Sequence, residues 1–358
     1  MNQNPKFIFS GGGTGGHIFP AVAIAHELKK NHPNAEFLFI GAIGRMEMEK
    51  VPAEGFQIIG LPVQGLKRQF TLQNFKVAYN FIKSYFKARK IIKEFNPNVA
   101  IGTGGYVSLP VLYAAQKLNI PTVIWEGNGY AGLANKILAK NASAICTGLP
   151  NMDKFFPSNK IHFLGNPIRQ SILQKVDKIS ALAHFNLSTA KRTVFITGGS
   201  LGARNINLGI EQALPLLAQN QIQVIWQTGK NFTSNISPNY GYIHAFINEM
   251  NLAYQAADVV VSRAGAISIS EICALQKPAI LIPSPNVTDD HQTKNAIALS
   301  KENAAILWPD SDYGNLGTTI VELIQNPNLL LALQQNILPF AKPNSTQNIA
   351  QLISQFIS

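Results

Sequence analysis

Two glycine-rich segments, placed half the chain apart, carry the residues best suited to chemistry. Each follows a short β-branched and aromatic run and precedes a helical pattern: residues 7–28 read FIFSGGGTGGHIFPAVAIAHEL and residues 194–214 read VFITGGSLGARNINLGIEQAL. Glycine permits positive φ and close approach of the backbone to a ligand. The free N–H groups and the dipole of the following helix attract an anion. The sequence therefore predicts one anion-binding loop in each half.

The first loop, Gly11–Gly16, ends beside His17, a candidate general base. No Gly-Lys-Ser/Thr follows the loop, so it is not a Walker A loop. Pro20 is tolerated in a first helical turn, which places His17 at the junction of loop and helix. A lone histidine usually caps or packs locally. A helix N-terminus disfavours an imidazolium, however, so a neutral His17 that accepts a proton is expected.

Two further segments of the first half follow predicted strands. Gly102–Tyr106 (GTGGY) is either a second ligand loop or a tight turn without a ligand. Glu126 lies in Trp125–Asn128 (WEGN), and polar groups at the carboxyl end of a strand point toward the ligand in this architecture. Alternatively, Glu126 only accepts hydrogen bonds from N–H groups at a helix start.

The second half offers three polar segments. Gly198–Arg204 places Ser200 where it suits a phosphate oxygen, although Arg204 fits a solvated helix residue as well. Ser262–Glu271 follows an apolar strand, and Glu271 could accept two hydrogen bonds from a ribose diol; the alternative is a first-turn acid favoured by the helix dipole. Asp289–Asn295 fits no familiar set of metal ligands, which favours a hydrogen-bonding loop for a polar ligand.

Strand-like runs alternate with helical stretches, which indicates βαβ units, mostly parallel sheets and an α/β fold. At 358 residues the chain is long enough for two domains, with a boundary expected near residues 165–169. The tail, residues 345–358, is typical of an amphipathic helix. The predicted strands are Phe7–Phe9, Glu36–Ile40, Val99–Ile101, Thr122–Trp125, Ser143–Thr147, Ile161–Leu164, Thr193–Thr197, Gln223–Gln227, Tyr242–Phe246, Val259–Val261, Ala279–Ile282 and Ala305–Leu307.

Composition sets broad limits. The formal charge of +11 attracts anions in general, whether phosphates, nucleotides, anionic lipids or nucleic acid. Without an apolar run of spanning length or a secretory signal pattern, the chain is expected to be made and kept in the cytosol. Cys146 and Cys273 lack metal-like spacing, so two buried, reduced thiols are expected. Residues 65–95 combine basic and aromatic side chains, which favours a partly exposed membrane-surface helix over an ordinary amphipathic one.

Seven motifs together resemble the MurG family of bacterial glycosyltransferases. In chain order they are GGTGGHIFPAVAIAHEL, GTGGYVSLP, WEGNGYAGLANK, GNPIR, GGSLGARNIN, SRAGAISISE and DDHQTKNA. One such motif is weak evidence, whereas seven in register over nearly the whole chain are highly specific. The resemblance implies transfer of N-acetylglucosamine from UDP-N-acetylglucosamine (UDP-GlcNAc) to the 4-hydroxyl of undecaprenyl-pyrophosphoryl-MurNAc-pentapeptide, in peptidoglycan biosynthesis.

The resemblance also implies a GT-B fold, in which two Rossmann-like domains with parallel sheets face a cleft. Residues 1–168 would form an acceptor- and membrane-facing domain, and residues 169–341 would bind UDP-GlcNAc. The C-terminal helix, residues 342–358, would pack back on the first domain. The protein would lie peripherally on the cytoplasmic face of the inner membrane, bound to its anionic surface, with no nucleic acid as a partner.

Site roles follow from the same resemblance. Arg169 and Ser200 would meet the diphosphate, the backbone of Ile247 would hold uracil, and Glu271 would take the ribose hydroxyls. The sugar would lie against Gln292, with His291 beside it. The remaining expected substrate contacts are Thr14, Gly15, Gly16, Asn128, Arg263, Ala266, Ile267, Ser268, Ile269 and Ser270.

The implied reaction is inverting and uses no metal and no cofactor, in agreement with the lack of an Asp-x-Asp pair. Helix dipoles and Arg169 would carry the charge of the leaving diphosphate. The catalytic residues would be His17 as the base and Glu126 as an assisting or orienting group. One motif departs from the family: the usual His-Glu-Gln-Asn is Trp125-Glu126-Gly127-Asn128 here, which weakens inferences about acceptor contacts at positions 125 and 127.

Two other functions fit parts of the pattern. A GT-B transferase for another acceptor, such as a diglyceride or an aglycone, would use the same donor motifs. A nucleic-acid-binding protein would use the charge of +11 and bind in a salt-dependent way, but it leaves the glycine loops and Glu271 unexplained.

Overall fold

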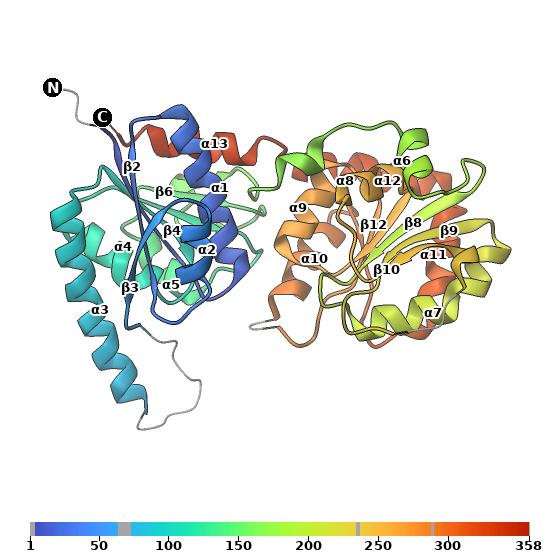
Figure 1. Cartoon of the computed structure of the whole chain (residues 1–358), viewed down its shortest axis with the longest axis horizontal. Coiled ribbons are helices and arrows are strands. Elements are labelled where there is room, and N and C mark those ends of the chain that lie inside the picture. Colours follow the sequence, from blue (N-terminus) through green and yellow to red (C-terminus); the bar gives the residue numbers. More distant parts are fainter. Residues whose placement is uncertain (1–3, 64–72, 234–236, 288–289, 358) are drawn as a thin grey trace. The chain divides into compact units, whose positions relative to one another are not determined.

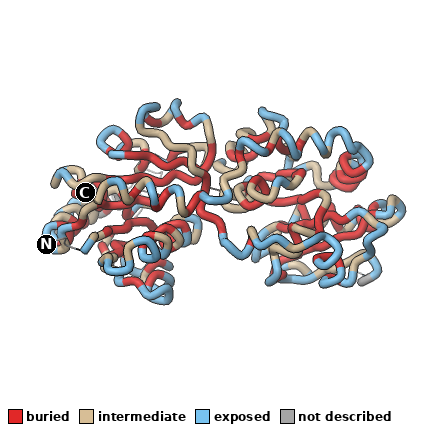
Figure 2. Tube along the Cα trace, turned by 90° about the horizontal axis from the view of Figure 1, so that it is seen from above, coloured by how far each residue is buried: buried red, intermediate tan, exposed pale blue. Residues whose placement is uncertain are grey.

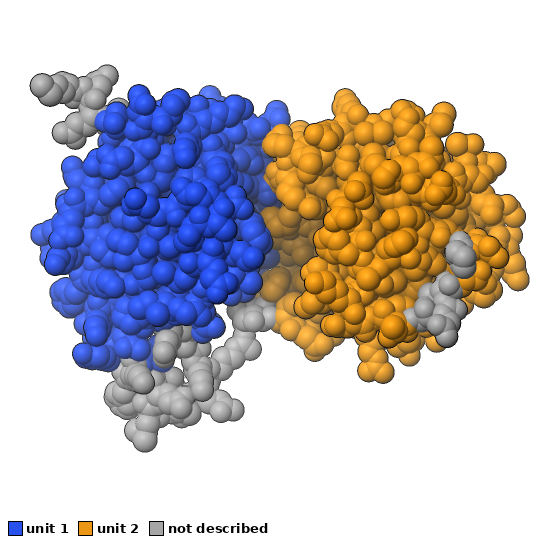
Figure 3. All heavy atoms as spheres, viewed as in Figure 1, with its two compact units in different colours: residues 1–167, 344–358 blue, residues 168–343 orange. Residues whose placement is uncertain are grey.

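The computed structural model describes residues 4–63, 73–233, 237–287 and 290–357 (Figure 1). Contacts divide the chain into two compact units, each with its own core. Unit 1 comprises residues 1–167 and 344–358, and unit 2 comprises residues 168–343 (Figure 3). The chain thus leaves unit 1 once and returns to it with its last helix.

Unit 1 is built on a parallel sheet that has seven strands within the described residues. Its spatial order is β3-β2-β1-β4-β5-β6-β7, so the chain starts in the middle, runs to one edge and then continues from β4 to the other edge. The strands are β1 (Lys6–Gly11), β2 (Glu36–Ala42), β3 (Gln57–Leu61), β4 (Val99–Gly104), β5 (Thr122–Glu126), β6 (Ala144–Thr147) and β7 (Ile161–Phe163).

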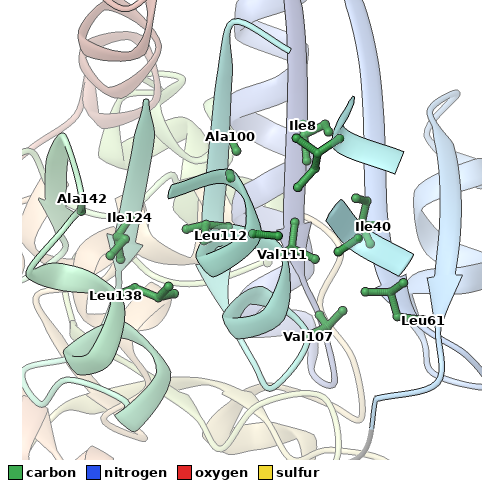
Figure 4. Close-up of a cluster of buried hydrophobic side chains, with 14 of the residues drawn as sticks. Ile8, Ile40, Leu61, Ala100, Val107, Val111, Leu112, Ile124, Leu138 and Ala142 are labelled. Carbon is green, nitrogen blue, oxygen red and sulfur yellow. The ribbon is translucent and has the colours of Figure 1, made fainter. Parts of the chain in front are cut away.

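Helices cover both faces of this sheet because successive strand residues point to opposite sides. Ile8 packs with the helices of one face, where Figure 4 shows the buried aliphatic side chains. Phe7 and Phe9 pack on the other face, in a second cluster that includes Ile349 and Ile353 of the C-terminal helix. The first face holds α3 (Gln73–Phe95), α4 (Ser108–Lys117) and α5 (Leu133–Ala139); the second holds α1 (Gly15–Asn31), α2 (Glu47–Ala53) and α13 (Ser345–Ser354).

Unit 2 repeats the plan with a parallel sheet of six strands within its described part, ordered β10-β9-β8-β11-β12-β13. One face packs on α7, α11 and α12, and on the other Tyr254 of α8 meets Phe195 of β8. The strands are β8 (Arg192–Thr197), β9 (Ile222–Gln227), β10 (Gly241–His244), β11 (Val259–Ser262), β12 (Ala279–Leu281) and β13 (Ile306–Leu307). The helices are α6 (Lys178–His184), α7 (Arg204–Gln219), α8 (Met250–Ala256), α9 (Ala266–Ala274), α10 (His291–Ser300), α11 (Leu316–Ile324) and α12 (Pro327–Asn336).

The predicted α/β fold with parallel, Rossmann-like sheets is confirmed. Each predicted strand has an observed counterpart, and the buried residues follow the strands (Figure 2).

The prediction was wrong in omitting β3, whose sequence QIIGL is short and is interrupted by Gly60. It also placed the end of β10 at Phe246, whereas the strand ends at His244. Cys146 and Cys273 are buried and free, as predicted.

The segment predicted as a basic, aromatic helix is described only in part. Residues 64–72, with Lys67, Arg68 and Phe70, lie outside the described residues, and α3 occupies Gln73–Phe95. Where the structure describes the chain, none of its helices combines the length and the apolar character that crossing a membrane demands.

In each sheet the strand order reverses at one point: successive strands are added toward one edge and then, from that point, toward the other edge. In unit 1 this lies between β1 and β4, and in unit 2 between β8 and β11. The loops that leave two adjacent strands there diverge to opposite faces of the sheet, which opens space for a ligand at the carboxyl ends of the strands. The glycine segments predicted from the sequence follow β1, β4 and β8, so they lie at these positions.

Candidate active site

His17 is the third residue of α1, directly after the first glycine loop, with Thr14 at the N-cap and Gly15 and Gly16 in the first turn. Its Nδ1 lies 3.0 Å from the carbonyl oxygen of Gly12. A carbonyl only accepts, so Nδ1 carries the hydrogen and Nε2 is left as the acceptor nitrogen. The half-buried ring is therefore held in the tautomer that a general base at Nε2 requires.

The glycine segment after β4 packs against this loop. The N–H of Gly12 donates to the carbonyl of Gly104 at 3.3 Å, and the Thr103 hydroxyl donates to the carbonyl of His17 at 2.8 Å. Gly104 has φ +104°, and a Cβ there would lie 2.8 Å from Cδ2 of His17. GTGGY thus packs against the imidazole of His17, and its contact with a ligand stays a prediction.

Glu126, at the end of β5, is 6% exposed, and both of its carboxylate oxygens accept hydrogen bonds within unit 1. Oε1 accepts from the backbone and side-chain nitrogens of Asn128 at 3.2 and 3.4 Å. Oε2 accepts from the N–H of Gly132 and from Nδ2 of Asn135, both at 2.9 Å. Gly132 is the N-cap of α5. This geometry matches the helix-start alternative. The catalytic role of Glu126 and the substrate contact of Asn128 stay predictions.

In unit 2, the glycine loop after β8 is tied to the predicted uracil position. Thr197 accepts at Oγ1 from the N–H of Gly199 and from Nε2 of Gln227, both at 3.2 Å. Oε1 of Gln227 accepts from the N–H of Ile247 at 3.1 Å. Ser200 is exposed in the same loop, just before the N-terminus of α7. Gln227 therefore fixes the loop and the Ile247 backbone in one arrangement.

Glu271 lies in the second turn of α9, which begins at Ala266 after the N-cap Gly265. This position rules out the first-turn alternative. The side chain is only 4% exposed. Its Oε1 accepts from Nη2 of Arg169 at 3.2 Å, and its Oε2 accepts from the hydroxyl of Tyr254 at 3.3 Å. The structure thus joins two residues that the resemblance assigns to different parts of a nucleotide diphosphate.

The charges of this cluster are linked. Burial raises the pKa of Glu271 above its usual range, and the charge of Arg169 with the hydrogen bonds from Arg169 and Tyr254 partly offsets that rise. Burial and the nearby Glu271 carboxylate raise the pKa of Tyr254 well above its ordinary value. The phenol consequently stays protonated and donates to Glu271.

Arg263, directly after β11, has its guanidinium in contacts within unit 2. Nη1 donates to the carbonyls of Ile282 and Pro283 at 3.2 and 3.1 Å and to Oδ1 of Asp310 at 2.6 Å. Oδ2 of Asp310 accepts from Asn205 of α7 at 2.7 Å. These bonds connect the ends of β11, β12 and β13 with the start of α7. Arg263 therefore holds the carboxyl edge of the sheet, and its contact with a substrate stays a prediction.

The remaining predicted residues lie at the same edge of the sheet. Gln292, the second residue of α10, accepts from the N–H of Ser284 at 2.8 Å, and His291 is the first residue of that helix. In α9, Ile269 is fully buried, so its contact with a substrate stays a prediction. The half-buried positions of this helix start are Ala266, Ile267, Ser268 and Ser270.

Sequence reasoning missed Tyr254, Asp310 and Glu47. Glu47 is fully buried, and its Oε2 accepts from the N–H of Gly13 in the first glycine loop at 3.0 Å. Of these three, only Asp310 could have been found from the sequence, because it follows an apolar strand. Tyr254 lies in an ordinary helical pattern, which does not distinguish it from a core residue. Across the described ranges, no group of three or more His, Cys, Asp or Glu side chains could hold a metal ion.

The comparisons with known proteins bear on this geometry. Residues 7–147 match the N-terminal domain of glycosyltransferase family 28, and residues 193–353 match the C-terminal domain of that family. The chain belongs to glycosyltransferase family 28. It is thus a glycosyltransferase, as predicted, and the two matched domains fit the predicted GT-B fold.

Members of the family align over nearly their full length. A relative from Parabacteroides distasonis is 47% identical over 98% of each chain, and one from Cytophaga hutchinsonii is 48% identical over 99% of this chain and 98% of its own. Both are named UDP-N-acetylglucosamine–N-acetylmuramyl-(pentapeptide) pyrophosphoryl-undecaprenol N-acetylglucosamine transferase.

Solved structures agree. Acinetobacter baumannii MurG superposes with a TM-score of 0.81 at 26% identity, covering 98% of this chain and 99% of that one. The glycotransferase of kitacinnamycin has a TM-score of 0.72 at 14% identity, covering 99% and 100%, and so shares the fold. The resemblance to the MurG family is confirmed.

The Glu271 cluster yields a prediction that needs no ligand. Tyr254→Phe should raise the pKa of Glu271 further, because the carboxylate loses a donor while its burial and the ring contact with Phe195 remain. The measurement is a ¹³C NMR titration of the glutamate carboxyl groups. Tyr79→Phe, at an exposed position of α3, is the matched control and should leave Glu271 unchanged. An unaltered or lower pKa in Tyr254→Phe would contradict the assignment.

Proposed function

We propose that the chain transfers N-acetylglucosamine from UDP-GlcNAc to the 4-hydroxyl of undecaprenyl-pyrophosphoryl-MurNAc-pentapeptide, with inversion and without a metal ion. The observation that carries this proposal is the near-complete alignment, at 47% and 48% identity, with relatives whose name states this transfer. The imidazole geometry in unit 1 and the carboxylate–guanidinium cluster in unit 2 support the roles given below.

Unit 1 supplies the base. Nε2 of His17 accepts the proton of the acceptor 4-hydroxyl as its oxygen attacks the anomeric carbon of the donor sugar. The bond between that carbon and the diphosphate breaks on the opposite side, and the electron pair leaves with UDP. A single in-line displacement inverts the configuration. The hydrogen bond from Nδ1 to Gly12 stays in place while the imidazolium forms, so the ring keeps its orientation.

Unit 2 binds the donor. Glu271 accepts the ribose hydroxyls, the backbone of Ile247 holds uracil, and Arg169 with Ser200 and the N–H groups at the start of α7 meets the diphosphate. Oriented backbone donors and a guanidinium stabilise the charge that develops on the leaving group, the task that a cation performs in metal-dependent transferases. Arg169, whose side chain is 60% exposed, can turn from Glu271 toward a phosphate.

The chain is proposed to act as a peripheral protein on the cytoplasmic face of the membrane. On α3, Tyr79, Ile82 and Phe86 are 63%, 55% and 61% exposed and share one helical face. Lys83 and Lys90 are exposed on the same helix. Apolar side chains flanked by lysines suit the headgroup region of an anionic bilayer, where a lipid-linked acceptor resides.

The transfer assay tests the reaction itself. With radiolabelled UDP-GlcNAc and the muramyl lipid, label should enter the lipid fraction, and excess EDTA should leave the rate unchanged because no step uses a cation. UDP-glucose as donor, and a diglyceride or an aglycone as acceptor, are the controls and should give much slower transfer. Preference for another acceptor would refute the substrate assignment, and loss of activity in EDTA with recovery in Mg²⁺ would refute the metal-free reaction.

The base assignment predicts a selective loss of turnover. His17→Ala should lower kcat by about 10²–10⁴-fold, because the hydroxyl proton loses its acceptor. The affinity for UDP, measured by calorimetry, should change little, since UDP is bound by unit 2. His26→Ala, which removes an exposed histidine from the same helix, is the control and should retain normal kcat. Near-normal turnover of His17→Ala would remove His17 as the base.

The membrane assignment predicts a loss of vesicle binding. Ile82→Ser with Phe86→Ser should reduce co-sedimentation with vesicles that contain anionic lipid, because two exposed apolar side chains are removed from the docking face. Added salt should weaken binding by the unaltered chain as well, through screening of the lysines. Leu331→Ser, at an exposed apolar position of α12, is the control. Equal co-sedimentation of all three proteins would contradict docking through α3.

A further inference from the structure

Glu47 is a buried acid that the reaction outlined above does not use. It is the first residue of α2 and is fully buried. Burying a carboxylate is costly unless hydrogen bonds satisfy its oxygens. Both are satisfied by backbone donors: Oε1 accepts from the N–H of Ala42, at the end of β2, and Oε2 accepts from the N–H of Gly13, each at 3.0 Å. The carboxylate thereby links the end of a strand to the first glycine loop.

The backbone around Glu47 is shaped to admit it. A Cβ on Gly12 would lie 2.1 Å from Oε1 of Glu47, and a Cβ on Gly41 would lie 2.7 Å from its Cγ. Neither contact is sterically possible, so glycine is required at both positions while the carboxylate is in place. One glycine of the loop that resembles an anion cradle therefore makes room for an anionic side chain of the protein itself.

The contact with Gly13 reaches His17 through a single peptide group. The N–H of Gly13 and the carbonyl of Gly12 belong to the same planar unit, in which the two bonds are fixed relative to each other. Glu47 accepts from the N–H end, and the carbonyl end accepts from Nδ1 of His17 at 3.0 Å. The order is carboxylate, peptide, imidazole. Fixing the N–H end also fixes the direction of the carbonyl.

We propose that Glu47 is a positioning residue that sets the tautomer and orientation of His17 through the Gly12–Gly13 peptide. A carboxylate on the N–H polarises the peptide and strengthens its carbonyl as an acceptor, since hydrogen bonds in a chain reinforce one another. The stronger acceptor retains the hydrogen on Nδ1 and leaves Nε2 to take the proton. That this matters for turnover rests on the proposed function of His17.

The test substitutes the carboxylate with its neutral isostere. In Glu47→Gln, the side-chain oxygen can accept from Ala42 or from Gly13 but not from both, and the amide NH₂ faces the other N–H. Glu49→Gln, two residues further along α2 at an exposed position, is the matched control. Gly12→Ala is a second variant. Its added Cβ displaces the Glu47 carboxylate by steric overlap, whereas no charged group of the protein is removed.

The decisive readout is the ¹⁵N NMR spectrum of the His17 ring, assigned by comparison with His17→Ala. The unaltered chain and Glu49→Gln should show hydrogen on Nδ1, whereas Glu47→Gln and Gly12→Ala should shift the ring toward the other tautomer. In both variants kcat should fall by about 10–100-fold, the size of effect found when the hydrogen-bond partner of a metal-ligating histidine is removed. The Kd of UDP reports whether unit 2 is intact, and the thermal unfolding midpoint of each variant reports whether the fold is intact. The kcat is expressed per folded protein.

The outcomes separate the two proposals. An unchanged tautomer in folded Glu47→Gln and Gly12→Ala overturns the role of Glu47, even where His17→Ala is inactive. A shifted tautomer together with normal turnover of His17→Ala sustains the peptide link and overturns His17 as the base. If activity in both variants falls only in proportion to the fraction of folded protein, Glu47 is a structural residue and the inference is also overturned.

Discussion

The close approach of two backbone loops, after β1 and after β4 in the unit 1 sheet, is the constraint on which the position of the His17 imidazole depends. Gly12 lies so near Gly105 that a Cβ on Gly105 would be 2.4 Å from the Gly12 carbonyl oxygen. That approach lets the N–H of Gly12 reach the carbonyl of Gly104 and brings His17 beside β4. The glycines after β1 and β4 thus serve first to join two loops, and the position of the imidazole follows from that junction.

At the equivalent edge of the unit 2 sheet, the main constraint is the buried carboxylate of Glu271. Glu271 is buried, and burial opposes the ionisation of its carboxyl group; on the proposed function, this group must be ionised to accept from ribose hydroxyls. Tyr254 and Arg169 counter this with a buried hydrogen bond and an exposed guanidinium, respectively. On the proposed function, a ribose hydroxyl would replace the hydrogen bond that Glu271 loses when Arg169 turns to the diphosphate, so both carboxylate oxygens would still accept a hydrogen bond.

The sequence was sufficient for the layout because the signals of that layout are local. Apolar runs followed by glycine identified the strands and the loops at their carboxyl ends, and β3 was missed where Gly60 interrupts a short strand. The partners of the polar groups were not predictable in this way. Glu47 and Gly13 are 34 residues apart, and Arg263 and Asp310 are 47 residues apart. Helical periodicity does not tell which acid is buried or which backbone N–H it meets.

The departure from the family at Trp125-Glu126-Gly127-Asn128 has a physical explanation in this chain. Trp125 is 3% exposed and packs in the cluster that contains Phe7 and Phe9. A Cβ on Gly127 would lie 2.5 Å from the Cη2 atom of the Trp125 ring, so the large residue and the missing side chain are complementary. In this chain, the buried Trp125 ring therefore requires glycine at position 127. Glu126, between them, accepts from the backbone N–H groups of Asn128 and Gly132 and from the side chain of Asn135, none of which is supplied by Trp125 or Gly127.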